Sequence, residues 1–266
     1  MTRPMNSTTL EIALPCRVDL LQTRGWVLPA RGSAGPNGPV FAVVHGIGLS
    51  HRPYGRLARE LRRHGTVVGL DLPGFGGMRK PASAVSVEEF AVCVRETITE
   101  LQLRPVIAIG HSMGAQIALE LALAAPGQVD LVVVIGPVVN PRHRTLIQQM
   151  FALARDTIRE PAATNLMVLR DYLTCGMSWY LLEAREMIRY RTDFRAVDLD
   201  VPILAIRGQD DVIAPADWCD WLADQGPLGS SVSVPGHRHV VSHSAPEITA
   251  QLIADFARAS QATSVD

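Results

Sequence analysis

The stretch PVIAIGHSMGAQIALELALAA, residues 105–125, decides the fold of this chain. Its first six residues are a short apolar, β-branched run, which predicts a strand buried on both faces. Residues 113–125 are rich in alanine and leucine, which predicts a helix. Between them Gly110 and Gly114 lie two positions on either side of Ser112. A serine at the apex of a sharp strand-to-helix turn needs such glycines, because larger side chains there would collide.

Working outward, short β-branched runs alternate with helical stretches from residue 40 onward, which is typical of a mostly parallel sheet with helices on both faces. The first forty residues predict one or two antiparallel edge strands. Ser86 and Glu89 have the spacing of a capping box at the start of a helix. The fold class is therefore α/β, with expected strands at 39–45, 66–70, 105–110, 129–136, 202–208 and 230–234, and expected helices at 54–64, 86–101, 113–125, 216–224 and 246–259.

The alternation stops between residues 141 and 198, where the sequence predicts helices only. A structureless loop longer than roughly 15 residues is uncommon, so this segment is expected to be an inserted helical subdomain. We expect helices at 145–159 and 165–190, the second one interrupted near Gly176. The predicted organisation is a core of residues 1–140 and 199–266 with a helical cap of residues 141–198.

The composition excludes several classes of protein. Apolar residues make up 47% and charged residues 19%, which is incompatible with general disorder, and a net charge of −1 argues against nucleic acid as a partner. No apolar stretch approaches the roughly twenty residues of a membrane span. The polar N-terminus lacks the pattern of a secretory signal, and the four cysteines are far apart, which favours neither a zinc site nor disulfides. We therefore expect a cytoplasmic protein whose partner is a small-molecule substrate.

The order of polar residues after the strands points to nucleophilic catalysis by Ser112. The segment HGIG after the first buried strand places the backbone amide of Ile47 where, with that of Met113, it could bind an oxyanion. An acid is expected after residues 202–208, where Asp210 and Asp211 are both candidates. A base is expected after the last strand, where three histidines compete: His237, His239 and His243. The chain order Ser, Asp, His is the one expected for such a sheet.

At this point the sequence resembles the α/β-hydrolase fold, from about residue 39 to residue 259. The segments that carry the resemblance are HGIG (45–48), LDLPGFG (70–76), GHSMG (110–114), GQDDVIAP (208–215) and PGHRHVVSHSAPE (235–247). The family's acid turn, commonly G-x-x-D-x-x-x-P, selects Asp211. Its catalytic histidine stands seven residues before a proline, here Pro246, which selects His239. The chain departs from the pattern at Arg238, where relatives commonly have glycine, and at Gly77-Met78, where many have a small polar residue.

The resemblance implies acyl transfer through Ser112, Asp211 and His239, with no metal or organic cofactor. Serine at position 112 argues against the haloalkane dehalogenases and epoxide hydrolases of the same fold, which use aspartate there. The cap of such proteins roofs the pocket and sets substrate choice. We expect a mostly apolar pocket bordered by Gly46, Val138, Val139, Met150, Tyr172 and Trp179.

The leading hypothesis is a serine hydrolase of a carboxylic ester or lactone. Hydrolysis of a C–C bond in a ring-cleavage diketone uses the same triad, but it favours a Gly-Pro-Gly oxyanion loop, and residues 48–53 read GLSHRP here. A non-catalytic ligand receptor is a third reading, because the fold hosts receptors as well. The intact set of Ser112, Asp211 and His239 weighs against it.

Overall fold

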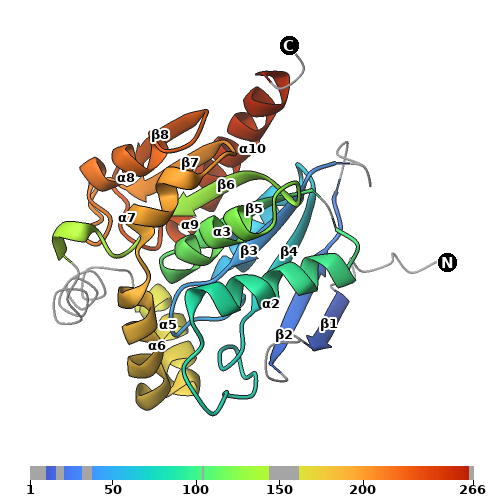
Figure 1. Cartoon of the computed structure of the whole chain (residues 1–266), viewed down its shortest axis with the longest axis vertical. Helices are drawn as coiled ribbons and strands as arrows, with labels where there is room; N and C mark the ends of the chain where they lie inside the picture. Colours follow the sequence, from blue (N-terminus) through green and yellow to red (C-terminus); the bar gives the residue numbers. More distant parts are fainter. Residues whose placement is uncertain (1–9, 16–20, 32–37, 104, 144–161, 264–266) are drawn as a thin grey trace.

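A twisted sheet forms the centre of the molecule in the computed structural model, which describes residues 10–15, 21–31, 38–103, 105–143 and 162–263 (Figure 1). Within these residues the sheet has eight strands in the order β1-β2-β4-β3-β5-β6-β7-β8. The pairs β1–β2 and β2–β4 are antiparallel, and all other neighbours are parallel. The strands are β1 Leu10–Pro15, β2 Gln22–Leu28, β3 Val40–Val44, β4 Thr66–Asp71, β5 Val106–His111, β6 Val129–Ile135, β7 Ile203–Gly208 and β8 Gly229–Val234.

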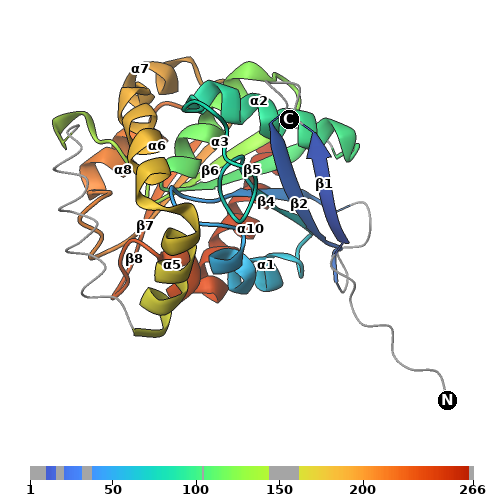
Figure 2. The same ribbon diagram turned by 90° about the horizontal axis from the view of Figure 1, so that it is seen from below.

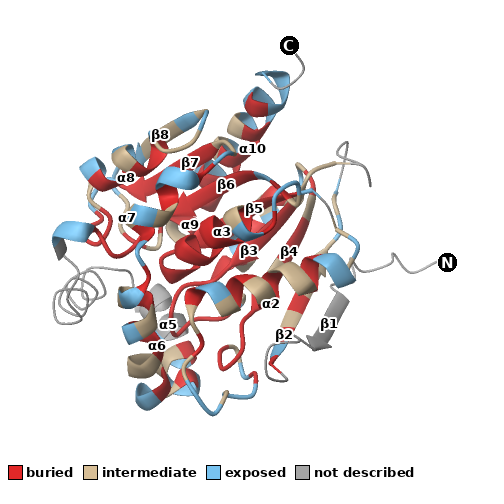
Figure 3. Ribbon diagram, in the orientation of Figure 1, coloured by how far each residue is buried: buried red, intermediate tan, exposed pale blue. Residues whose placement is uncertain are grey.

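Helices cover both faces of this sheet, as the sequence predicts. Successive side chains of a strand point to opposite faces of the sheet, and in β3 both faces are apolar. Ala42 and Val44 belong to the buried cluster on one face, and Phe41 and Val43 belong to the cluster on the other. Residues of α2, α3 and α8 pack in the first cluster, and residues of α1, α9 and α10 pack in the second. Figure 3 shows the central strands β3, β5 and β6 buried between these layers. The core helices are η2 Arg52–Tyr54, α1 Gly55–Leu61, α2 Val87–Glu100, α3 Met113–Ala124, α8 Ala216–Ala223, α9 Val241–Ser244 and α10 Pro246–Thr263.

The predicted elements of the core are confirmed to within a few residues. The capping box also forms, because Ser86 Oγ accepts from the Glu89 amide and the Glu89 carboxylate accepts from the Ser86 amide. In the part of the chain that the structure describes, no helix is long and apolar enough to cross a membrane.

The described residues between 141 and 198 form helices and no strand. They are η3 Pro141–His143, α5 Ala162–Cys175, α6 Met177–Arg189, α7 Thr192–Arg195 and η4 Ala196–Asp198. The interruption expected near Gly176 separates α5 from α6, which lie side by side at one side of the sheet (Figures 1 and 2). The expected helix 145–159 lies outside the described residues, and the division into core and cap stays a prediction.

The parallel strands bring the loops after them to one edge of the sheet. Because β3, β5, β6, β7 and β8 run in the same direction, the segments that follow their carboxyl ends meet there. These segments contain the residues that the sequence singles out, at 45–48, 112–113, 138–139, 210–211 and 237–239.

Candidate active site

Ser112 occupies a strained backbone conformation between the end of β5 and the start of α3. Its φ of 57° and ψ of −119° are rare for a residue other than glycine. A side-chain carbon at Gly110 would lie 2.0 Å from the Gly114 carbonyl oxygen, and one at Gly114 would lie 2.3 Å from the Val44 carbonyl oxygen. The turn therefore needs both glycines, for the steric reason expected from the sequence.

Asp211 and His239 form a buried hydrogen-bonded pair. Asp211 Oδ2 lies 2.9 Å from His239 Nδ1, and the two residues are only 2% and 4% exposed. Since a carboxylate only accepts, the proton lies on Nδ1 and the lone pair of the neutral ring lies on Nε2, the atom that can take a proton from a nucleophile. A side-chain carbon at Gly136, after β6, would lie 2.9 Å from His239 Nδ1, so only glycine leaves room for the ring.

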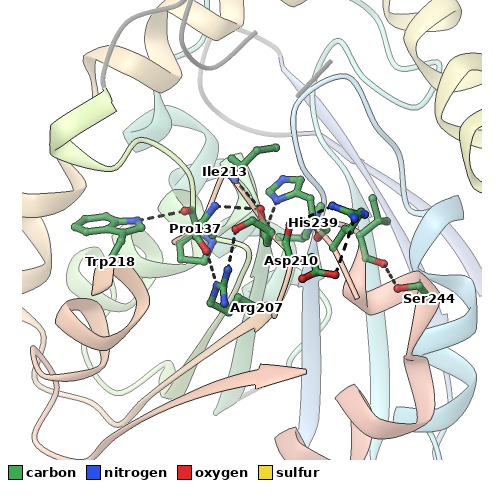
Figure 4. Close-up of polar contacts among 12 residues, drawn as sticks. Pro137, Arg207, Asp210, Ile213, Trp218, His239 and Ser244 are labelled. Carbon is green, nitrogen blue, oxygen red and sulfur yellow. Dashed lines mark hydrogen bonds and ion pairs between the residues drawn. The ribbon is translucent and has the colours of Figure 1, made fainter. Parts of the chain in front are cut away.

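The surroundings of Asp211 favour its ionised form. Burial alone would raise the pKa of this carboxyl, but the His239 charge and hydrogen bond, with the amides of Ala214 and Ile213, hold it below its usual value. Figure 4 shows these contacts around Ile213 and His239. Asp211 is therefore a carboxylate whose two oxygens are both engaged.

Arg207 shapes the turn that carries this acid, a role that the sequence reasoning missed. Its buried guanidinium donates from Nε to the Ala214 carbonyl at 2.6 Å, and from Nη2 to the Asp211 carbonyl at 2.8 Å. A third donor, Nη1, reaches Ser233 Oγ on β8 at 3.1 Å. The sequence feature that could have indicated this role is the charged residue within the otherwise apolar strand β7, ILAIRG.

The competing candidates lie elsewhere. His237 Nδ1 pairs with Ser244 Oγ at 2.8 Å, and His243 Nδ1 pairs with the Pro53 carbonyl at 3.1 Å. Asp210 is exposed and its carboxylate lies 3.9 Å from the Arg238 guanidinium. Of the candidate acids and bases, the structure brings only Asp211 and His239 together as a buried pair.

The loop after β3 lies against the serine with its peptide groups held by His45. A side-chain carbon at Gly46 would lie 3.0 Å from Ser112 Cβ, so the two backbones are close. His45 Nε2 accepts from the Leu72 amide at 3.1 Å, so Nδ1 carries the proton and donates to the Gly46 carbonyl at 2.9 Å. In a trans peptide the carbonyl and amide point in opposite directions, so the Ile47 N–H points away from His45. The other expected oxyanion donor, Met113, is the first residue of α3.

Apart from Gly46, the residues expected to border the substrate lie in the segment after β6 and on helices α5 and α6, and one lies outside the described residues. Val138 and Val139 are buried after β6, and Val139 has a φ of 62°, which is unusual for a β-branched residue. Met150 lies outside the described residues. The Tyr172 ring of α5 lies over Gly48, where a side-chain carbon would be 2.4 Å from it, and the Trp179 indole of α6 lies equally close over Gly74.

A second contact joins α5 to the loop after β3. Ser50 Oγ donates to Asp171 Oδ2 at 2.6 Å, and the Arg52 guanidinium lies 3.5 Å from Asp171 Oδ1. Ser50 and Asp171 are both buried, so this charge-assisted contact fixes α5 beside the loop that contains Ile47.

No group of three or more histidine, cysteine, aspartate or glutamate side chains suited to a metal ion occurs in the described part of the chain. The thiols of Cys175 and Cys219 are also poor ligands and nucleophiles, since burial raises their pKa values to about 11 and about 12. The groups that the sequence predicts for the site are a hydroxyl, an imidazole, a carboxylate and backbone amides.

Glu183 of α6 is a buried acid that does not belong to the expected set of Ser112, Asp211 and His239. It is 1% exposed, its Oε1 accepts from the Val85 amide at 3.0 Å, and burial raises its pKa to about 8 from 4.5. Between these two pH values the unfolded chain loses this proton while the folded chain keeps it. The free energy of unfolding therefore falls as the pH rises from about 4.5 to about 8.

Replacing Glu183 with glutamine is expected to remove this penalty, because the amide keeps the acceptor for Val85 and cannot ionise. We expect the variant to be more stable than the parent by about 2 to 4 kcal/mol at pH 8, and close to it at pH 4.5. Urea unfolding at the two pH values measures both quantities. Glu100→Gln, at the exposed end of α2, is the matched control and should change neither value. An unchanged pH dependence in Glu183→Gln would contradict the assignment.

The chain is similar to a known protein family and to two curated hydrolases. Residues 41–252 match the alpha/beta hydrolase family. The chain shares 25% identity over 237 residues with (E)-2-((N-methylformamido)methylene)succinate hydrolase of Acinetobacter baylyi, which covers 79% of this chain and 87% of the relative. It shares 27% identity over 238 residues with pimeloyl-[acyl-carrier protein] methyl ester esterase of Nitrosomonas europaea, which covers 79% and 92%.

A solved structure shows the same fold. The enol-lactonase from Burkholderia xenovorans LB400 superimposes with a TM-score of 0.75 at 18% identity, covering 93% of this chain and 100% of that one. The family match begins in β3 and ends in α10, and the candidate site lies where the parallel strands end. The chain is a member of the alpha/beta hydrolase family.

Proposed function

We propose that this protein is a serine hydrolase that cleaves a carboxylic ester or lactone of a mainly apolar small molecule. The observation that carries the proposal is the buried pair of Asp211 and His239, beside a strand-to-helix turn that holds Ser112 in a strained conformation. A pair with this orientation supplies a base with its lone pair on Nε2, which a serine nucleophile requires.

The reaction proceeds in two halves. In the first, Ser112 Oγ attacks the substrate carbonyl while His239 Nε2 takes its proton and then gives it to the leaving alkoxide, which departs as the alcohol. The Asp211 carboxylate stabilises the imidazolium that forms. In the second, His239 takes a proton from water, the hydroxide attacks the acyl-enzyme, and the proton returns to Ser112 as the acid leaves.

The backbone amides of Ile47 and Met113 stabilise the oxyanion in both halves. Support for the first comes from His45, which holds the Gly46 carbonyl and so directs the neighbouring N–H away from itself. Support for the second comes from its place at the start of α3, where amides are free and the helix dipole favours negative charge. One such donor typically contributes about 3 to 4 kcal/mol to transition-state stabilisation.

Apolar and aromatic side chains support a substrate of low polarity. Tyr172 and Trp179 belong to α5 and α6 and lie over two glycine turns of the core, while Val138 and Val139 follow β6. The names of the relatives, an esterase and a hydrolase of an N-methylformamido compound, support an acyl derivative as the substrate.

A fluorophosphonate probe combined with a substrate panel tests the proposal. The probe is expected to label the folded wild type at Ser112, located by peptide mass spectrometry, and to leave Ser112→Ala unlabelled. The panel contains p-nitrophenyl esters of increasing acyl length, aliphatic lactones, an N-formyl enamine and a dienoate diketone. Turnover of esters or lactones is the expected result.

The other readings predict different results in the same experiment. Turnover of the diketone alone would assign C–C hydrolysis, and turnover of the enamine alone would assign amide hydrolysis. A folded wild type without label and without turnover would leave a ligand receptor as the function.

A further inference from the structure

The hydroxyl of Tyr54 joins two parts of the site that are distant in the sequence. Tyr54 ends η2 and is 3% exposed. Its oxygen accepts from the Gly46 amide at 3.1 Å and lies 2.7 Å from His111 Nδ1. One buried side chain therefore contacts both the loop after β3 and the residue that precedes Ser112.

The direction of these hydrogen bonds follows from the partner on the other side of the His111 ring. His111 Nε2 lies 3.0 Å from the carbonyl oxygen of His239, which only accepts, so Nε2 carries the proton. Nδ1 is then an acceptor, and Tyr54 must donate to it. Burial, aided by the charge of His239, lowers the pKa of His111 to about 3, so the ring is neutral and this direction holds at neutral pH.

A single chain of hydrogen bonds thus runs from the Gly46 amide through Tyr54 and His111 to the carbonyl of His239. At its first end, Gly46 has its amide held by Tyr54 and its carbonyl held by His45. The two peptide groups around Gly46 are therefore both fixed, including the one that contains the Ile47 amide. At its other end, the chain fixes the backbone of the residue whose side chain is paired with Asp211.

We propose that Tyr54 and His111 are a positioning pair. They hold the loop after β3, which contains the Ile47 amide, and the loop that contains His239 in fixed positions relative to the turn at Ser112. The inference rests on the serine-hydrolase function proposed above and extends it to two side chains that do not react. Preorganised donors act by being in place before charge develops, so a displacement of either loop slows the chemical step more than it weakens binding.

Tyr54→Phe removes the acceptor for the Gly46 amide and the donor for His111 while keeping the ring in the core. We expect kcat on a p-nitrophenyl ester to fall about 10- to 100-fold with KM changed less than threefold, because small misplacements of reacting groups cost rates of this order. The rate constant for fluorophosphonate labelling of Ser112 should fall in parallel.

Tyr190→Phe is the matched control. Tyr190 is 4% exposed, and its hydroxyl donates to Glu120 Oε2 at 2.8 Å, a contact between the α6–α7 junction and α3. This variant loses an equally buried hydroxyl and is expected to lose stability, while kcat and the labelling rate stay within twofold of the wild type. A fall in kcat of equal size in both variants would assign Tyr54 a general structural role and overturn the inference.

His111→Gln is a second variant that tests the pair should Tyr54→Phe fold poorly. Its amide can still donate toward the His239 carbonyl, but the ring acceptor for Tyr54 is lost. We expect at least a 10-fold fall in kcat, and a double variant no slower than the slower single variant, because the two side chains act as one unit. Additive losses would contradict the pair.

The labelling experiment separates this inference from the function on which it rests. An unlabelled wild type would overturn the hydrolase proposal and the inference together. A labelled wild type with an equally fast, folded Tyr54→Phe would overturn the inference alone.

Discussion

Replacing His239 with alanine is expected to lower kcat by about 10⁴- to 10⁶-fold with the fold intact, because the proposed mechanism requires its imidazole to take the proton of Ser112. The side chain is 4% exposed and pairs with Asp211 at 2.9 Å. Steady-state turnover of the best ester in the panel measures the loss, and circular dichroism with thermal unfolding verifies that the variant is folded.

His237→Ala is the control, two residues away in the same loop. Its ring pairs with Ser244 Oγ at 2.8 Å, and its contact with the acid turn is made by its backbone carbonyl, which accepts from the Asp210 amide. The substitution removes the ring and keeps that backbone contact, so most of the turnover should remain. The opposite result, with His237→Ala inactive and His239→Ala active, would show that the base had been assigned to the wrong histidine.

The core of this fold could be predicted because its signals are local. A parallel strand buried on both faces has a continuous apolar sequence, as in VIAIG before Ser112, and a helix start has a capping box, as at Ser86 and Glu89. At the Ser112 turn the need for glycine at position 110 is local as well, because a side-chain carbon there would contact the Gly114 carbonyl. The need at position 114 is not local, because the contact is with the Val44 carbonyl of β3. The strand, the helix start and Gly110 could therefore be predicted from residues that are close together in the chain.

Within the candidate site, too, contacts between residues that are distant in the sequence could not be predicted. The resemblance to the family, in which the catalytic histidine stands seven residues before a proline, selects His239, whereas the residues alone leave three histidines open. Tyr54 could not be assigned in this way, because its partners Gly46 and His111 are 8 and 57 residues away. The contact of Asp171 with Ser50, across 121 residues, likewise depends on how α5 packs on the core.

Asp211→Asn is expected to lower kcat by about 10⁴-fold while leaving the acid turn in place. The Oδ1 atom can still accept from the Ile213 and Ala214 amides, at 2.8 and 3.1 Å in the parent protein, so the side chain should keep its position. The amide nitrogen then faces His239 Nδ1 and donates to it, which forces the proton of the neutral ring onto Nε2. In that tautomer His239 cannot take the proton of Ser112. Turnover and fluorophosphonate labelling should therefore fall together, with KM little changed.

Asp210→Asn provides the neighbouring control for this prediction. Asp210 is exposed, its carboxylate lies 3.9 Å from the Arg238 guanidinium, and an exposed ion pair of this kind contributes at most about 1 kcal/mol to stability. The backbone bond from its amide to the His237 carbonyl does not depend on the side chain. We therefore expect turnover within about twofold of the wild type. Equal losses in the two variants would mean that the turn as a whole, rather than the Asp211 carboxylate, supports His239, and would remove the acid from the proposed triad.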